Sequence, residues 1–177
     1  DEGPRDAPAI VFSNSMFFDV TMFEKQAAAF ADNYRVVRYD HRGQGGSAKA
    51  PRDELNMDTL ADDTAALIEA LGLQKCCFVG NSMGGFIALR LAARRPDLIA
   101  SAVIMGSSAD AEVSVEAMEA VVEVIEQNGV SPVVEDVLYF MLGDTTLNDP
   151  DRAAIQQRVM KMLESRTPDY AHSVWNI

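Results

Sequence analysis

The stretch that most constrains this chain is an apolar segment that runs into a serine flanked by glycines. The segment covers residues 75–79 and continues into Gly80-Asn81-Ser82-Met83-Gly84, after which residues 86–95 have the composition of a helix. Glycine has no Cβ, so it tolerates positions where two backbone segments come very close together. The pattern therefore predicts a buried strand, a tight turn that presents the Ser82 hydroxyl, and a helix.

Two residues of this turn are candidates for chemistry. Ser82 would be a nucleophile at the edge of a sheet. The backbone amide of Met83 would lie at a helix N-terminus, where it can donate a hydrogen bond to an oxyanion. The alternative interpretation is a glycine-rich turn between a strand and a helix that only packs closely.

Composition and charge exclude several classes of function. The 177 residues suffice for one domain with a core, and 48% apolar and 24% charged residues are ordinary for a soluble globular protein. The net charge of −12 argues against nucleic acid and anionic membrane surfaces as partners. No apolar run is long enough to span a membrane. Residues 1–6 are polar, and we expect no secretory signal in them.

The cysteines and histidines indicate a reducing compartment and no metal. Cys76 and Cys77 are neighbours in a predicted strand, so their side chains should point to opposite faces and remain unbonded. We therefore expect a cytoplasmic protein. The two histidines, His41 and His172, belong to no metal-binding motif, and we expect neither a metal nor a cofactor.

Strands and helices alternate in the first part of the chain. Residues 8–13, 34–40 and 98–105 are further apolar runs typical of strands. Helical patterns cover residues 21–31 and 58–71. This alternation of helices with nearly all-apolar strands predicts a parallel sheet covered on both faces, with residues 98–105 as a fourth buried strand.

The pattern changes after residue 108. No strand is expected in the remainder, where methionines and a tryptophan provide adaptable apolar surface. We predict a core in residues 1–108 and a helical cap in residues 109–177, which either only packs against the core or covers a pocket as a lid. The helical patterns of the cap cover residues 114–128, 131–142, 151–165 and 169–175.

Three motifs together resemble the α/β-hydrolase superfamily, and the resemblance covers nearly all of the chain. Residues 80–85 are similar to the nucleophile elbow of that family. Residues 39–47, YDHRGQGGS, are similar to its D-x-R-G-x-G-x-S loop. Residues 13–16, SNSM, stand where many members carry His-Gly and the first oxyanion amide. Phe17 departs from the pattern, because the family has a glycine after the apolar oxyanion residue.

The resemblance implies a partial α/β-hydrolase core followed by a helical cap. It implies Ser82 as the nucleophile, with the amides of Met16 and Met83 as the oxyanion hole. Apolar and aromatic cap residues would contact the substrate, and the candidates are Tyr139, Met141 and Trp175.

Within the superfamily, the chain is most similar to the 3-oxoadipate enol-lactonase group. That group shares the Ser-Asn-Ser sequence of residues 13–15 and a loop like residues 38–47. The similarity implies hydrolysis of a small ester or lactone. The alternative is a carbon–carbon bond hydrolase of the meta-cleavage-product type, in which the sequence of residues 80–85 is also frequent. Those enzymes usually have a glycine-rich oxyanion loop, which residues 14–17 are not.

The catalytic acid and histidine of this family follow later strands, beyond the cap. We therefore expect them in a C-terminal segment of the same fold that is missing from this chain. His41 is interpreted as a loop residue near the pocket and not as the base, and His172 is not assigned as the base either. We expect Asp40 to orient its loop through Arg42 or backbone amides.

Two further hypotheses remain. The chain could be an inactive fragment or one half of a noncovalent pair, whose exposed sheet edge would seek a partner strand. It could also be a lyase, a dehalogenase or a cofactor-free oxygenase of the same fold, although dehalogenases usually carry an aspartate at the position of Ser82.

Overall fold

The computed structural model describes residues 1–109 and 115–168, and these residues form a parallel sheet, its covering helices and a separate helical layer. The sheet has four strands in the order β2-β1-β3-β4. The strands are β1 (Ala9–Ser13), β2 (Arg35–Tyr39), β3 (Cys76–Asn81) and β4 (Ile99–Met105). The helices are α1 (Glu24–Phe30), α2 (Met57–Ala70), α3 (Met83–Arg94), α4 (Val115–Asn128), α5 (Val134–Met141), α6 (Asp144–Leu147) and α7 (Ala153–Glu164).

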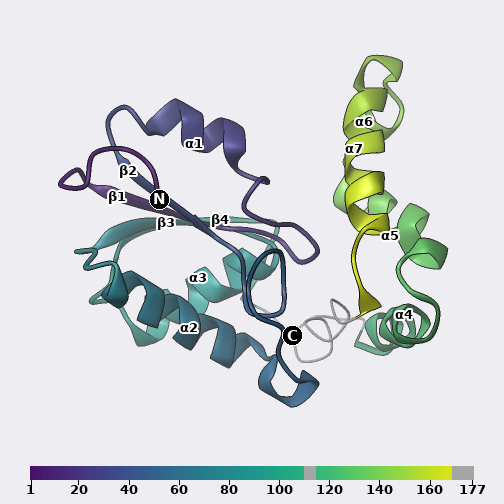
Figure 1. The fold of residues 1–177 in the computed structure, drawn as a ribbon, viewed down its shortest axis with the longest axis horizontal. Coiled ribbons are helices and arrows are strands. Elements are labelled where there is room, and N and C mark those ends of the chain that lie inside the picture. Colours follow the sequence, from purple (N-terminus) through teal and green to yellow (C-terminus); the bar gives the residue numbers. More distant parts are fainter. Residues whose placement is uncertain (110–114, 169–177) are drawn as a thin grey trace.

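Helices cover both faces of the sheet, as the sequence predicted. Successive residues of a strand point to opposite faces. Val11 of β1 accordingly packs in a cluster with α2 and α3, whereas Ile10 and Phe12 pack on the other face. Phe23 and Ala27 close that second cluster from the side of α1. Figure 1 shows α1 on one face and α2 and α3 on the other.

The prediction that residues 98–105 form a buried strand is wrong in one respect. The strand exists, but β4 is an edge strand that pairs only with β3 among the described residues. Its side chains lie largely open, and Val103 and Ile104 remain 46% and 37% exposed. An apolar run indicates that a strand favours burial, but burial also needs a neighbour, which local sequence does not specify.

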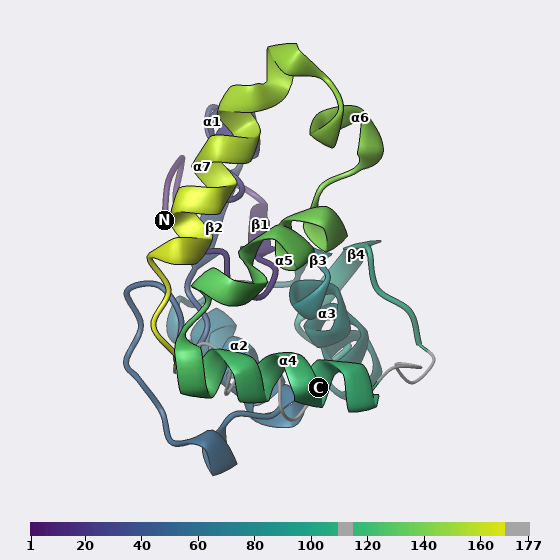
Figure 2. The same cartoon turned by 90° about the vertical axis from the view of Figure 1, so that its right-hand side faces the viewer.

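The segment after β4 forms a helical layer with an apolar cluster of its own. Ile125, Leu138 and Leu163 are buried in this cap cluster. Phe17, from the loop after β1, is buried in it as well. The layer stands beyond the carboxyl ends of the strands in Figure 1, and Figure 2 shows α4 and α5 in front of the sheet.

The predicted helices that fall within the described residues are present, with shifted boundaries. The helix expected over residues 21–31 begins at Glu24, after a turn. The helix expected over 131–142 begins with a short 3-10 segment, Ser131–Val133. The short helix α6 was not predicted, and the pattern at 169–175 lies outside the described residues. No helix in the described part of the chain has the length and apolarity needed to cross a membrane.

Candidate active site

Ser82 occupies a strained turn between β3 and α3, and close backbone contacts surround that turn. Its φ is 51°, in the left-handed region that few residues other than glycine adopt. A Cβ on Gly80 would lie 2.1 Å from the Gly84 carbonyl oxygen. A Cβ on Gly84 would lie 2.1 Å from the carbonyl oxygen of Ser13 in β1. The steric reason that the sequence suggested for both glycines is therefore confirmed.

The turn holds Ser82 through its backbone and leaves its side chain available. The Ser82 amide donates to the Met105 carbonyl at 2.8 Å, and the Ser107 hydroxyl donates to the Ser82 carbonyl at 2.7 Å. The Ser82 side chain makes no capping hydrogen bond with α3, and the residue is partly exposed. This combination of a fixed backbone and a hydroxyl that does not cap the helix suits a nucleophile.

The loop after β1 is tied to this turn. The Ser15 hydroxyl donates to Asn81 Oδ1 at 2.7 Å, one residue before Ser82. Met16, the next residue of the loop, packs against the same cluster that contains Met83. Met83 is the first residue of α3, where the helix offers its amide no acceptor. The structure thus brings together the two segments that carry the predicted oxyanion amides.

Phe17 has a backbone conformation that usually requires glycine. The Phe18 amide donates to the Ser15 carbonyl at 3.2 Å, which closes a turn over residues 15–18. Phe17 is the third residue of that turn and has a φ of 67°. A positive φ at the third position is the signature of a type II turn, which normally requires glycine. The departure from the family pattern therefore changes the side chain and leaves a glycine-type backbone.

His41 is a buried support of the loop after β1. It is 2% exposed, and its Nε2 lies 3.1 Å from the Asn14 carbonyl oxygen, to which it donates. Its ring meets the Tyr39 ring edge-on. Burial lowers the pKa of His41 to about 4, against the opposing effect of the Asn14 carbonyl. A histidine with a pKa of about 4 is a weak base, and Nε2 of His41 already donates to Asn14, so His41 is poorly suited to take a proton from Ser82.

We expect the His41 side chain to make folding sensitive to acid. Between pH 6.5 and 4 the unfolded chain binds a proton at His41 and the folded chain does not, so stability falls as the pH falls. The loss amounts to about 3 kcal/mol by pH 4. His41→Gln cannot titrate, so its stability relative to the wild type should improve by about that amount between pH 7 and pH 4. Urea unfolding at several pH values measures this difference, and a difference that does not change with pH would contradict the prediction.

Asp40 organises the glycine-rich loop through backbone amides. Its Oδ1 accepts from the Val20 amide at 2.7 Å, and its Oδ2 accepts from the Gly46 amide at 2.8 Å. The predicted orienting role of Asp40 in its own loop is confirmed for the Gly46 amide, and the Val20 amide belongs to the loop after β1. Arg42 instead forms ion pairs with Asp63 and Glu54.

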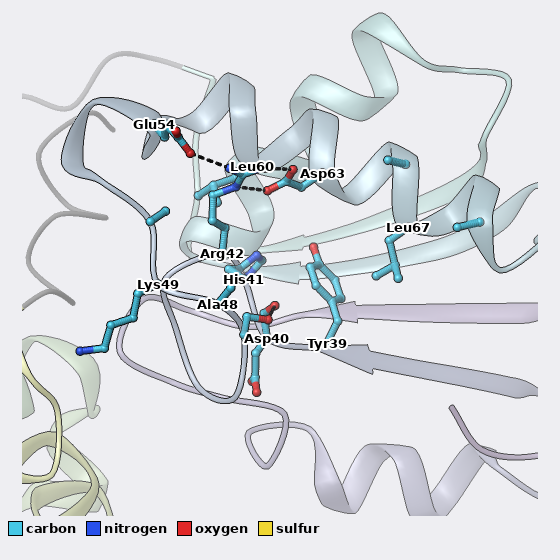
Figure 3. Close-up of a pocket in the computed structure, with 14 residues that line it drawn as sticks. Tyr39, Asp40, His41, Arg42, Ala48, Lys49, Glu54, Leu60, Asp63 and Leu67 are labelled. Carbon is cyan, nitrogen blue, oxygen red and sulfur yellow. Dashed lines mark hydrogen bonds and ion pairs between the residues drawn. The ribbon is translucent and has the colours of Figure 1, made fainter.

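A cavity of about 690 Å³ lies beside this loop, away from Ser82. It is lined by the end of β2, the loop that follows β2, and the facing side of α2 (Figure 3). In Figure 3 Arg42 lies between Glu54 and Asp63, which hold its guanidinium in ion pairs. Neither Ser82 nor either predicted oxyanion residue lines this cavity, so it is not the site that the sequence predicted.

Of the three residues predicted to contact the substrate, the two that the structure describes differ in their exposure. Tyr139 on α5 is 72% exposed. Met141 is partly buried against the cap cluster. Trp175 lies outside the described residues, as does His172.

Comparisons with known proteins agree with the predicted fold class. A family model described as "alpha/beta hydrolase fold" matches residues 8–129. The 3-oxoadipate enol-lactonase 1 of Acinetobacter baylyi is 32% identical over 171 residues, which are 97% of this chain and 63% of the enol-lactonase. The bifunctional esterase/perhydrolase DCH of Acinetobacter calcoaceticus is 39% identical over 60% of this chain and 39% of its own length.

The backbone fold of the chain is also similar to that of a solved enol-lactonase structure. The enol-lactonase from Burkholderia xenovorans LB400 superimposes with a TM-score of 0.90 at 27% identity, covering 99% of this chain and 67% of that one. The chain thus spans less than two thirds of the first curated relatives that it matches, with 63% and 49% of the two Acinetobacter baylyi enol-lactonases. The predicted similarity to enol-lactonases is confirmed.

Proposed function

Because the chain belongs to the alpha/beta hydrolase fold family, we propose that it is the serine-bearing part of an enzyme that hydrolyses a small ester or lactone. The observation that carries this proposal is the conformation of Ser82, which sits at φ 51° between two glycines that the backbone requires. The similarity to enol-lactonases and to an esterase favours ester and lactone substrates.

In the proposed reaction, the Ser82 oxygen attacks the substrate carbonyl carbon and its proton passes to a base. The amides of Met16 and Met83 bind the negative charge that develops on the carbonyl oxygen. The alcohol or enol oxygen then leaves with a proton, and water releases the acid from Ser82 by the reverse sequence of steps.

We place the base and its acid partner outside the described residues, in a C-terminal segment of the same fold. Among the described residues, His41 is the one histidine. Its burial and its hydrogen bond to the Asn14 carbonyl make it unsuitable as the base. We propose that residues 1–108 belong to the core and residues 109–177 to the cap. Substrate contacts come from Tyr139, Met141 and Trp175. The enzyme acts in the cytoplasm on a small molecule and needs no cofactor.

A fluorophosphonate probe tests this proposal in the full-length protein. The probe traps an activated serine as a covalent phosphonyl ester, and peptide mass spectrometry locates it. We expect the label on Ser82, with Ser15 and Ser107 unlabelled, and no label in Ser82→Ala. The 177-residue chain alone should react much more slowly, because an unassisted hydroxyl is a weak nucleophile. A full-length protein that is unlabelled at Ser82 would refute the proposal.

A further inference from the structure

The Arg166 guanidinium, from the helical layer, binds the loop that carries the predicted oxyanion amide of Met16. Arg166 follows α7 and donates from Nε to the Phe17 carbonyl at 2.8 Å. Its Nη2 donates to Asp19 Oδ2, also at 2.8 Å. The Arg166 and Asp19 side chains are only 11% and 22% exposed. This is a largely buried, two-pronged contact, and such contacts hold geometry better than exposed ion pairs do.

The turn of residues 15–18, which Arg166 contacts, is strained. Phe17 has a φ of 67°, a left-handed conformation that is unfavourable for a residue other than glycine. Such a conformation persists only where surrounding structure enforces it. The helical layer contributes two such features: the burial of the Phe17 ring in the cap cluster, and the hydrogen bond from Arg166 to the Phe17 carbonyl. From the core side, Asn14 Nδ2 donates to the Phe18 carbonyl at 2.7 Å.

Asp19 is held as a charged partner for Arg166. Its Oδ1 accepts from the amide and the hydroxyl of Thr21, at 2.9 and 2.6 Å. Burial alone would raise the pKa of Asp19, but the hydrogen bonds from Thr21 and Arg166 outweigh burial and lower the pKa below its usual value. The carboxylate is thus ionised at neutral pH and fixed on the core side of the contact.

We propose that Arg166 is a positioning residue for the oxyanion hole. By holding the Phe17 carbonyl and the Asp19 carboxylate, it fixes the turn of residues 15–18, and with it the Met16 amide, whose neighbour Ser15 is hydrogen-bonded to Asn81. Docking of the helical layer thereby completes the oxyanion site. This inference rests on the proposed function of Ser82 and Met16.

The chain offers a matched control for the test. Arg158 of α7 pairs with Glu24 of α1 at 3.6 Å, so it too joins the helical layer to the core. The Arg158 and Glu24 side chains are each 64% exposed, and neither residue belongs to the turn of residues 15–18. Arg158→Gln therefore removes an ion pair between the same two layers and leaves the proposed positioning contact intact.

The first measurement is hydrogen exchange, which does not depend on activity. In the full-length protein, Arg166→Gln should speed exchange of the amides of residues 16–18 about tenfold or more, because the turn opens more often. Arg158→Gln should leave the exchange of these amides unchanged. Equal exchange in Arg166→Gln and the wild type would overturn the proposal, even if Ser82 proved to be inactive.

The second measurement is hydrolysis of p-nitrophenyl acetate. Misplacing one oxyanion donor should lower kcat about tenfold to a hundredfold in Arg166→Gln while KM stays within about twofold. Arg158→Gln should keep the wild-type kcat. A change confined to KM, or an equal loss of kcat in both variants, would overturn the proposal. Wild-type protein without activity or label at Ser82 would instead refute the proposed function.

Arg166→Lys keeps the test decisive if Arg166→Gln fails to fold. A lysine ammonium can pair with Asp19 but cannot reproduce the fork that also binds the Phe17 carbonyl. We expect this variant to recover the wild-type melting temperature and only part of the wild-type kcat. A lysine variant with the full wild-type kcat and wild-type exchange at residues 16–18 would contradict the positioning role.

Discussion

Ser82→Ala is expected to lower kcat for p-nitrophenyl acetate in the full-length protein by about 10⁴ to 10⁶, because removing the nucleophile of a serine hydrolase removes the covalent route entirely. The fold should tolerate the change. The Ser82 side chain makes no capping hydrogen bond with α3, and the turn is held through the Ser82 backbone. Steady-state kinetics corrected for spontaneous hydrolysis measure the loss, and circular dichroism checks that the variant is folded.

Ser107→Ala separates loss of the nucleophile from damage to the turn. The Ser107 hydroxyl donates to the Ser82 carbonyl at 2.7 Å, so its removal loosens the turn without touching the Ser82 hydroxyl. We expect a loss of kcat of at most about tenfold, in line with one lost hydrogen bond. If the two variants lost the same activity, or if Ser82→Ala kept the wild-type rate, Ser82 would not be the nucleophile.

The turn around Ser82 could be predicted from sequence because strand, turn and helix follow one another within residues 76–94, and because Gly80 is needed for a contact inside this segment, with the Gly84 carbonyl. The need for Gly84 comes from β1, and the sequence pattern marks this glycine without specifying the contact. The two-sided covering of the sheet was predictable for a similar reason, because a nearly all-apolar strand such as β1 must bury both of its faces.

The exposure of β4 and the role of Phe17 depend on distant parts of the chain. Val103 is as apolar as Val11, yet one lies on an edge strand and the other in the centre of the sheet. Phe17 looked like a departure from a glycine position, and its explanation is a cap cluster and a guanidinium 149 residues away. The burial of His41 was missed because its loop is otherwise rich in small and polar residues.

Gly84→Ala is expected to have a second large effect, on the free energy of unfolding. Helix propensity alone would raise that free energy, whereas the contact of Gly84 with β1 predicts that it falls. Gly84 lies inside α3, where alanine would favour the helix by about 0.5–1 kcal/mol. The new Cβ would, however, lie 2.1 Å from the Ser13 carbonyl oxygen and 2.6 Å from the Ser13 carbonyl carbon. These are backbone atoms of β1, so rotation of a side chain cannot relieve the clash. The helix and the strand must move apart.

We therefore expect Gly84→Ala to lower the free energy of unfolding by about 3 kcal/mol or more. Gly143→Ala is the matched control, because its Cβ would meet nothing within 4 Å and its φ is −70°. That variant should lose at most about 1 kcal/mol, because Gly143 is the N-cap of α6 and alanine is less favourable there. Urea unfolding at an unchanged m-value gives both numbers. A stable Gly84→Ala would mean that β1 and α3 can separate freely, and the close packing that fixes Ser82 beside the loop after β1 would then not be what determines this site.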